Sequence, residues 1–195
     1  MKYVKMLGLA AVAAMALSAF VAGPASASTL RSGTTALGVG AKIESSLKAG
    51  TSALLKDTGG LANDTCTGSE VKGSLSSVTP SSNPKGSISS LTFTGCSHTT
   101  TVLANGELEI KNIAGTTNGT VVSRNSRVTI KSTVFGISCT ANTGEGTTIG
   151  TLTGVTSGNA TMDINGVITL ENGCGDSTWT GTYLVTNPAG LNVEG

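Results

Sequence analysis

Charged and aromatic side chains are both scarce in this sequence. Charged residues make up 12% of the 195 residues, and 12 Lys and Arg stand against 11 Asp and Glu. Nucleic acids and anionic membrane surfaces need clustered basic side chains, so this balance argues against both as partners. Aromatic residues make up only 3%, so the core must be built from Val, Ile, Leu and Thr.

The single histidine, His98, limits the catalytic and metal sites that the chain can form. Structural zinc takes four ligands, usually as closely spaced pairs, and the cysteines here stand far apart in sequence. The Walker A, G-x-G-x-x-G and G-x-S-x-G motifs are missing. Gly175-Asp176-Ser177 matches the opening of one lipase class, but the Asp-x-x-His which that class needs near its C-terminus is missing too. We therefore expect no metal, no cofactor and no enzymatic activity, with a hydrolase as the least favoured alternative.

The N-terminus has the pattern of a secretory signal peptide. Lys2 and Lys5 precede an apolar, Ala-rich run from Met6 to Gly23, and Ala25-Ser26-Ala27 is an A-x-A cleavage site. The pattern predicts that residues 1–27 are removed by cleavage after Ala27. An uncleaved anchor is the alternative, since the apolar run is near the lower limit of about 18 residues for a membrane span. No later stretch is long and apolar enough, so we expect no membrane span in the mature chain.

All four cysteines follow this segment, and an even number in an exported chain indicates two disulfides. Cys66 and Cys139 lie in similar settings, TCTG and SCTA, and Cys96 and Cys174 each follow a glycine after an apolar run. This repeated order favours the pairs Cys66–Cys96 and Cys139–Cys174. Cys96 also shares a strand face with His98, which would suit a metal or a thiol nucleophile, but a disulfide is the favoured interpretation in an oxidising compartment.

Apolar residues recur with a period of two along most of the chain, as in strands. From Leu37 to Leu55 the odd positions are mainly apolar and the charges fall on even positions. A helix over 41–56 is the competing prediction, and Gly50 in its middle argues against it. Later segments are short, rich in Thr, Val and Ile, and separated by turn signals that include four Asn-Gly pairs, which supply the positive φ of tight turns.

These patterns predict an all-β fold, with residues 28–195 as a single disulfide-stapled domain. An antiparallel β-sandwich of Greek-key or jelly-roll type is the first choice, and a flattened β-barrel is the alternative. The segment Thr147–Val155 has no charge and no proline. It would favour self-association if it lay at a sheet edge, and a central position paired on both sides is equally compatible with its sequence.

Two groups of side chains are candidates for a binding surface. Trp179 and Tyr183 share a strand face with Gly181 between them, and form either part of the core or a platform for carbohydrate. Glu107 and Glu109 share a face with Lys111. This arrangement indicates a solvated stripe rather than a glycosidase pair, which needs a cleft and sugar-stacking aromatics.

The order of motifs resembles that of a group of uncharacterised secreted proteins of actinobacteria that are rich in Thr, Ser and Gly. The resemblance rests on Cys66-Thr-Gly-Ser, Gly86–Cys96, Ile137-Ser-Cys139-Thr, Gly150-Thr-Leu-Thr-Gly154, Ala160–Ile164, Cys174 and Trp179–Tyr183. It covers most of the chain after residue 27. It implies a bacterial exported β protein and brings no catalytic residues with it.

The sequence thus predicts a protein that is secreted or held at the cell surface. Our first hypothesis is a non-enzymatic structural, surface or matrix role of an adhesion-like kind, with the protein itself as a partner. The alternative is a carbohydrate-binding module that uses the Trp179/Tyr183 face, with a surface glycan as its partner. Exposure of Trp179 distinguishes the two.

Overall fold

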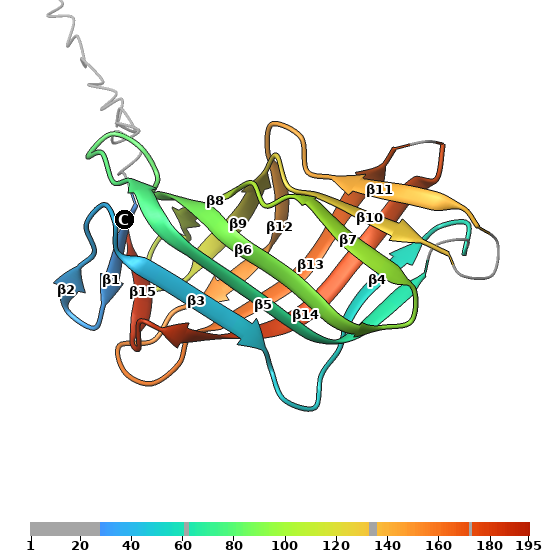
Figure 1. Cartoon of the computed structure of the whole chain (residues 1–195). Helices are drawn as coiled ribbons and strands as arrows, with labels where there is room; N and C mark the ends of the chain where they lie inside the picture. The colour runs from blue at the N-terminus through green and yellow to red at the C-terminus, as the bar shows by residue number, and fades with distance from the viewer. Residues whose placement is uncertain (1–27, 61–62, 133–135, 172) are drawn as a thin grey trace, which may run out of the picture.

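The computed structural model describes residues 28–60, 63–132, 136–171 and 173–195, and all of their regular structure is β-strand (Figure 1). The predicted signal peptide with its cleavage site at Ala27, and also Phe135 and Asn172, lie outside these residues. The strands are β1 (Thr29–Ser32), β2 (Thr35–Ala36), β3 (Lys42–Leu47), β4 (Ala53–Asp57), β5 (Asp64–Ser77), β6 (Lys85–Cys96), β7 (Thr99–Ala104), β8 (Glu107–Asn112), β9 (Gly119–Arg124), β10 (Arg127–Lys131), β11 (Ser138–Asn142), β12 (Thr147–Thr153), β13 (Thr161–Leu170), β14 (Gly175–Asn187) and β15 (Leu191–Glu194). The prediction of strands over a helix at 41–56 is confirmed by β3 and β4. Within the described residues there is accordingly no helix that could cross a membrane.

The period of two seen in the sequence is clearest in β13. Every even position from Met162 to Leu170 is buried, and the odd positions between them are exposed. Neighbouring side chains of a strand point to opposite faces, so β13 presents one apolar face to the interior. Asn165-Gly166 lies inside this strand rather than in a turn. A Cβ at residue 166 would lie 2.7 Å from the Cα of Ile149, so glycine is what allows β12 and β13 to approach at this point.

Eight antiparallel strands close into a barrel. Going round the ring, β3 pairs with β5, β5 with β6, β6 with β8, β8 with β9, β9 with β12, β12 with β13, β13 with β14, and β14 with β3. This closure fits the barrel alternative. The sandwich is not confirmed, because the additional pairs β3–β5 and β13–β14 close one continuous sheet into a ring.

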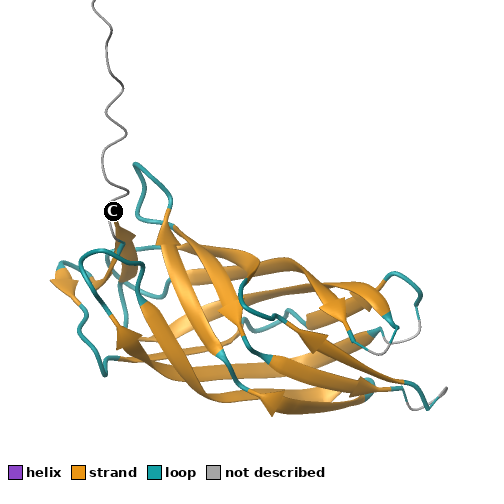
Figure 2. Cartoon of the chain, turned by 90° about the horizontal axis from the view of Figure 1, so that it is seen from above, coloured by secondary structure: helices purple, strands orange, loops and turns teal. Residues whose placement is uncertain are grey.

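The four long strands β5, β6, β13 and β14 continue beyond this ring and form a second half of the molecule (Figures 1 and 2). There β4 takes the place of β3 between β5 and β14, and β11, β10 and β7 follow in order from β13. No strand ladder joins β6 to β7 among the described residues. The two strands meet only near their ends, where the Ile88 N–H donates to the Gly106 carbonyl over 3.0 Å and a short turn links Cys96 to Thr99. We call the stretch between these ends the seam.

The two halves meet at three short interruptions between consecutive strands, which we call the waist: residues 105–106, 125–126 and 143–146. They lie side by side, since the Asn125 N–H donates to the Gly144 carbonyl and the Ser126 hydroxyl to the Asn105 carbonyl, both over 2.7 Å. Gly106 has the positive φ that its Asn-Gly pair predicts, 73°. Instead of turning a hairpin, however, it joins β7 and β8, which pair with the consecutive strands β10 and β9, respectively.

A small sheet in the order β15-β1-β2 lies at the end of the molecule opposite the seam (Figure 1). Leu30, Leu191 and Val193 of this sheet are buried and belong to the same hydrophobic cluster as the barrel interior. The sheet therefore covers that end of the barrel.

The uncharged segment Thr147–Val155 does not lie at an edge. Its strand β12 pairs with β9 on one side and with β13 on the other. The hypothesis of an open edge here is wrong, and the central position is confirmed. Among the described strands of the large sheet, it is β7 and the facing side of β6 that are left without a ladder partner.

Candidate functional site: the barrel interior

Two apolar cavities lie inside the barrel, each with a volume of about 70 Å³. Cavity 1 lies in the half that holds the seam, and its wall includes Leu55, Val128, Ile130, Ala141, Ile168 and Trp179. Cavity 2 lies in the half next to the small sheet, and its wall includes Leu30, Leu75, Ile110, Val185 and Leu191. An eight-stranded barrel is just wide enough either to be filled by side chains or to hold one small ligand.

Each cavity has a deeply buried part and a half-buried part, and in cavity 2 Ile43 and Ile110 are half-buried while Ser87 is exposed. Leu30, Leu75, Val185 and Leu191 in cavity 2 are at most 3% exposed. In cavity 1 the lining side chains on β13 are buried, whereas those on the seam side, such as Phe93, Thr100 and Val128, are half-buried. The half-buried part of the cavity 1 wall therefore lies on the seam side.

Trp179 and Tyr183 do share a face, as predicted, and that face points inward. The Tyr183 ring is 0% exposed and donates its hydroxyl to Ser69 Oγ over 3.0 Å. Burial raises the pKa of Tyr183 to about 12, although the hydrogen bond with Ser69 acts in the opposite direction. Trp179 is half-buried and meets Phe93 edge to face, with ring centroids 6.1 Å apart. Both residues line cavity 1, so they form no exposed platform on which a sugar ring could stack.

Three hydroxyl groups line cavity 1 where the waist crosses it, and all three are satisfied within the protein. Ser126 donates to the Asn105 carbonyl, the Ser123 hydroxyl lies 3.0 Å from that of Ser126, and Ser123 donates to Thr143 over 3.2 Å. Each residue is at most 7% exposed. Buried hydroxyls bonded to one another have little to offer a ligand, so the cavity is apolar in character.

Asp64 lies where β5, β6 and β7 meet, and its contacts show the structural role of the Cys96-Ser97-His98 stretch. Its carboxylate is 2% exposed and accepts hydrogen bonds from the Ser97 hydroxyl at 2.9 Å, the His98 backbone N–H at 3.0 Å, and the Thr100 hydroxyl. The predicted Cys66–Cys96 disulfide is confirmed immediately beside it. The stretch therefore ties the closed end of the seam, and His98 contributes its backbone to this corner.

Asp64, Cys66 and Cys96 are also the group of potential metal ligands that the described residues bring together, within 4.8 Å of one another. The two sulfur atoms are bonded to each other and the carboxylate oxygens already accept three hydrogen bonds. Cysteine binds a metal through its thiolate, which a disulfide does not offer, so this chemistry suits a structural corner and not a metal centre.

The second predicted disulfide, Cys139–Cys174, is also confirmed. It connects the start of β11 with the turn between β13 and β14. With both pairs formed, no described cysteine is free, and two disulfides fit an extracellular or otherwise oxidising location.

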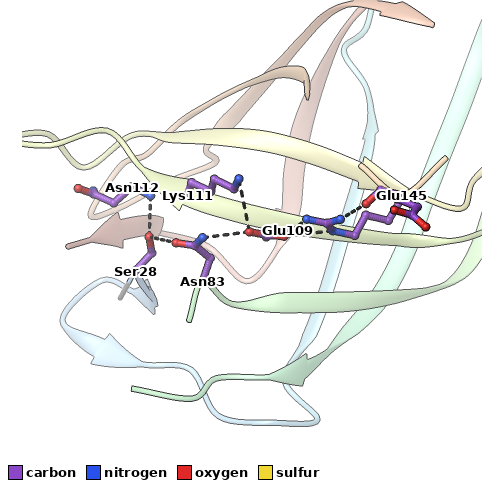
Figure 3. A network of polar contacts seen from close by, with 7 residues as sticks. Ser28, Asn83, Glu109, Lys111, Asn112 and Glu145 are labelled. Carbon is purple, nitrogen blue, oxygen red and sulfur yellow. Dashed lines mark hydrogen bonds and ion pairs between the residues drawn. The ribbon is translucent and has the colours of Figure 1, made fainter. Parts of the chain in front are cut away.

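One buried polar network was missed in the sequence. Glu109 was predicted to lie on a solvated stripe, yet it is 5% exposed on the outer face of β8. Arg124 donates to its carboxylate through Nε and Nη2, over 3.1 and 2.6 Å, and Asn83 donates from the other side over 2.9 Å (Figure 3). Asn83 in turn accepts from Ser28, which accepts the backbone N–H of Asn112. The network thus fixes the start of the described chain to the barrel wall.

A sequence signal for this network existed in the hairpin formed by β8 and β9. Pairing of Glu107 with Arg124 and of Glu109 with Val122 places the Arg124 side chain diagonal to Glu109 on the same face. The cover supplied by the loop at Asn83 comes from far away in sequence, and this is why burial of Glu109 could not be foreseen.

Acid should weaken this network. Burial acts to raise the pKa of Glu109, but hydrogen bonds from Arg124 and Asn83 and the charges of Lys111 and Arg124 outweigh it, so the pKa is lowered overall. A lowered folded-state pKa gives stability that is present above the unfolded value of about 4.3 and lost as the pH falls through the folded value. We expect Glu109→Gln to lower the free energy of unfolding by about 1–3 kcal/mol at pH 7, and the difference from wild type to shrink below pH ~4 in urea titrations. A difference that stayed constant from pH 7 to pH 2 would contradict this account, and Glu107→Gln on the same strand is the control.

No protein-family model, curated protein or solved structure matches the chain. The actinobacterial resemblance therefore remains a prediction, and the functional argument rests on the barrel interior.

Proposed function

We propose that the protein is an exported binding protein that takes a small apolar ligand into its barrel. The observation that carries the proposal is the pair of apolar cavities enclosed by the strands, one within the closed ring and one in the half that holds the seam. A native interior holds few voids larger than a water molecule, about 30 Å³. Each cavity here is more than twice that size, and an apolar cavity stays dry and attracts apolar guests.

Binding, rather than chemical conversion of the ligand, is supported by the polar groups around cavity 1. The Asp64 carboxylate, the Tyr183 hydroxyl and the hydroxyls of Ser123, Ser126 and Thr143 line it. Each is already engaged in hydrogen bonds with protein atoms. A catalytic base or nucleophile must be within hydrogen-bonding reach of its substrate, and these groups are directed elsewhere.

Filling cavity 1 should weaken binding at least tenfold. Ala141 is 7% exposed and lines cavity 1, and Ala141→Leu adds three carbon atoms to that wall. We expect 1-hexanol to change the fluorescence of Trp179 saturably in the wild type, and the variant to bind at least tenfold more weakly. Val167→Leu is the matched control, because residue 167 is on the outer face of β13 and 61% exposed; its affinity should equal that of the wild type.

The proposal fails if the wild type shows no saturable response, or if both variants bind 1-hexanol equally well. Thermal unfolding of each variant, followed by circular dichroism, shows whether Ala141→Leu is folded. Should it not be, Ile164→Phe places the same test on β13, whose residue 164 also lines cavity 1.

A structural or surface role is the second candidate, and the outer face of the seam favours it. Ser89, Thr92, Thr94, Thr99 and Thr101 are exposed along β6 and β7, and none carries a charge. Strand edges that are unpaired and uncharged are suited to pairing with another copy of the chain. The hexanol titration separates the candidates, since a purely structural role predicts no saturable binding.

A further inference from the structure

The two cavities are neighbours that share part of their walls. Val71, Ile88, Leu108 and Met162 line both of them. No other residue is common to the two linings, so these four side chains stand at the division between the cavities.

The division crosses the barrel from wall to wall. In the ring of eight strands, β13 lies four steps from β6 in either direction, so Met162 and Ile88 face each other across the interior. Val71 and Leu108 lie on β5 and β8, the two neighbours of β6 in the ring. Met162 is therefore the one member of the division that is supplied by the opposite wall.

Met162 is chemically suited to move. Methionine is unbranched with three rotatable bonds, and it fills irregular gaps without a fixed shape. The other three residues are branched, and branched side chains have fewer rotamers to choose from. Met162 is also the one methionine after residue 27, so the rest of the interior is built from less adaptable side chains.

Size also argues that the cavities are used together. A dry apolar cavity of about 150 Å³ takes a benzene molecule, and each cavity here has about half that volume. One alone could hold only a few heavy atoms. The two lie end to end, from the buried end at Leu30 and Leu191 to the half-buried Phe93 and Trp179 near the seam.

We infer that the two cavities are halves of one elongated site for a straight hydrocarbon chain, and that Met162 is the movable partition which the chain displaces. This rests on the proposed binding function. The tail of the ligand lies in cavity 2, against the buried Leu30, Leu75 and Leu191 at the end that the small sheet covers, and its polar end remains near the half-buried Trp179. A straight-chain alcohol or acid has this shape, and a branched or cyclic compound of equal carbon number does not.

A chain-length series tests the inference. The probes are 1-butanol, 1-hexanol and 1-octanol, with cyclooctanol as the compact counterpart of the longest. In the wild type we expect the affinity to rise roughly fourfold per added methylene, and 1-octanol to bind at least tenfold more tightly than cyclooctanol. In protein labelled with ¹³C at the methionine methyl, 1-octanol should shift the Met162 signal and 1-butanol should leave it in place.

Two substitutions at the partition make the test specific. Met162→Ile keeps the bulk but stiffens the side chain, so 1-octanol should bind at least tenfold more weakly while 1-butanol is unaffected. Met162→Ala removes the partition and should bring the affinity for cyclooctanol within threefold of that for 1-octanol. Val167→Ile on the outer face of the same strand is the control and should change neither ratio.

The outcomes separate the two proposals. If no alcohol binds the wild type, the binding function and the partition fail together. If the alcohols bind but Met162→Ile and Met162→Ala leave the chain-length and shape dependence unchanged, the partition is overturned and the binding function stands. Because each variant is compared with itself across the series, a uniform loss of stability cannot imitate the expected pattern, and loss of folding in one variant leaves the other to decide.

Discussion

Replacing Cys139 and Cys174 together with serine is expected to lower the free energy of unfolding by about 3–4 kcal/mol. The bond joins positions 35 residues apart, and a link of that span removes roughly this much from the conformational entropy of the unfolded chain in the entropic account. The loss should also have a local component. β11 is paired with β13 at one register position, Ala141 with Leu170, and is otherwise attached there mainly through Glu171. Amide hydrogen exchange should therefore accelerate in 138–142 and in the strands beyond it, 127–131 and 99–104.

The matched control is the double replacement of Cys66 and Cys96. Its loop is of similar size, 30 residues, but the two cysteines lie opposite each other in the long ladder between β5 and β6. We expect a comparable global loss with exchange in β10 and β11 close to wild type. Equal exchange patterns in the two variants would show that β11 is not held by its disulfide.

Removing the Asp64 side chain is expected to cost about 3 kcal/mol. Asp64→Ala leaves the Ser97 hydroxyl, the His98 N–H and the Thr100 hydroxyl without their shared acceptor. A buried polar group that loses its partner costs about 1–3 kcal/mol, and part of this is recovered where water can reach it. Asp64→Asn keeps the shape and one oxygen acceptor and should cost less.

His98→Ala is the comparison that identifies the role of this corner. The bond from residue 98 to Asp64 comes from the backbone, which alanine retains, so the stability should change by no more than about 0.5 kcal/mol. Chemical denaturation should show the largest loss of stability for Asp64→Ala, a smaller loss for Asp64→Asn and the smallest loss for His98→Ala. A larger loss for His98→Ala than for Asp64→Ala would show that the imidazole, and not the carboxylate, organises the turn.

Local features of the fold could be read from the sequence, whereas its closure could not. The pairing of the cysteines followed from their repeated settings, and the strands followed from the period of two. A sandwich and a barrel share that period, and what separates them here is the pairing of β3 with β5 and of β13 with β14. Closing the ring also requires β3 to pair with β14, which lies near the other end of the chain, and the periodicity of a strand does not say which distant strand becomes its partner.

The candidate site, too, could be predicted only in part from the sequence. That Trp179 and Tyr183 share a face was evident from their spacing, but the direction of the face depends on which side of β14 the barrel encloses. Met162 and Ile164 could be recognised as core residues. The space left between them and the opposite wall is a difference between enclosed volume and side-chain volume, and it exists only once the ring has closed.

The seam has a consequence for the timescale of binding. The group formed by β7, β10 and β11 is attached to the long strands by a disulfide, one register pair, the contacts of Glu171 and the Asp64 corner. Units attached in this way separate from a folded protein at a lower free energy than global unfolding requires. The residence time of a guest would then follow the frequency of this partial separation, independently of the affinity set by the cavity walls. Under the proposed binding function, a protein built in this way can retain its guest through dilution and still release it without unfolding.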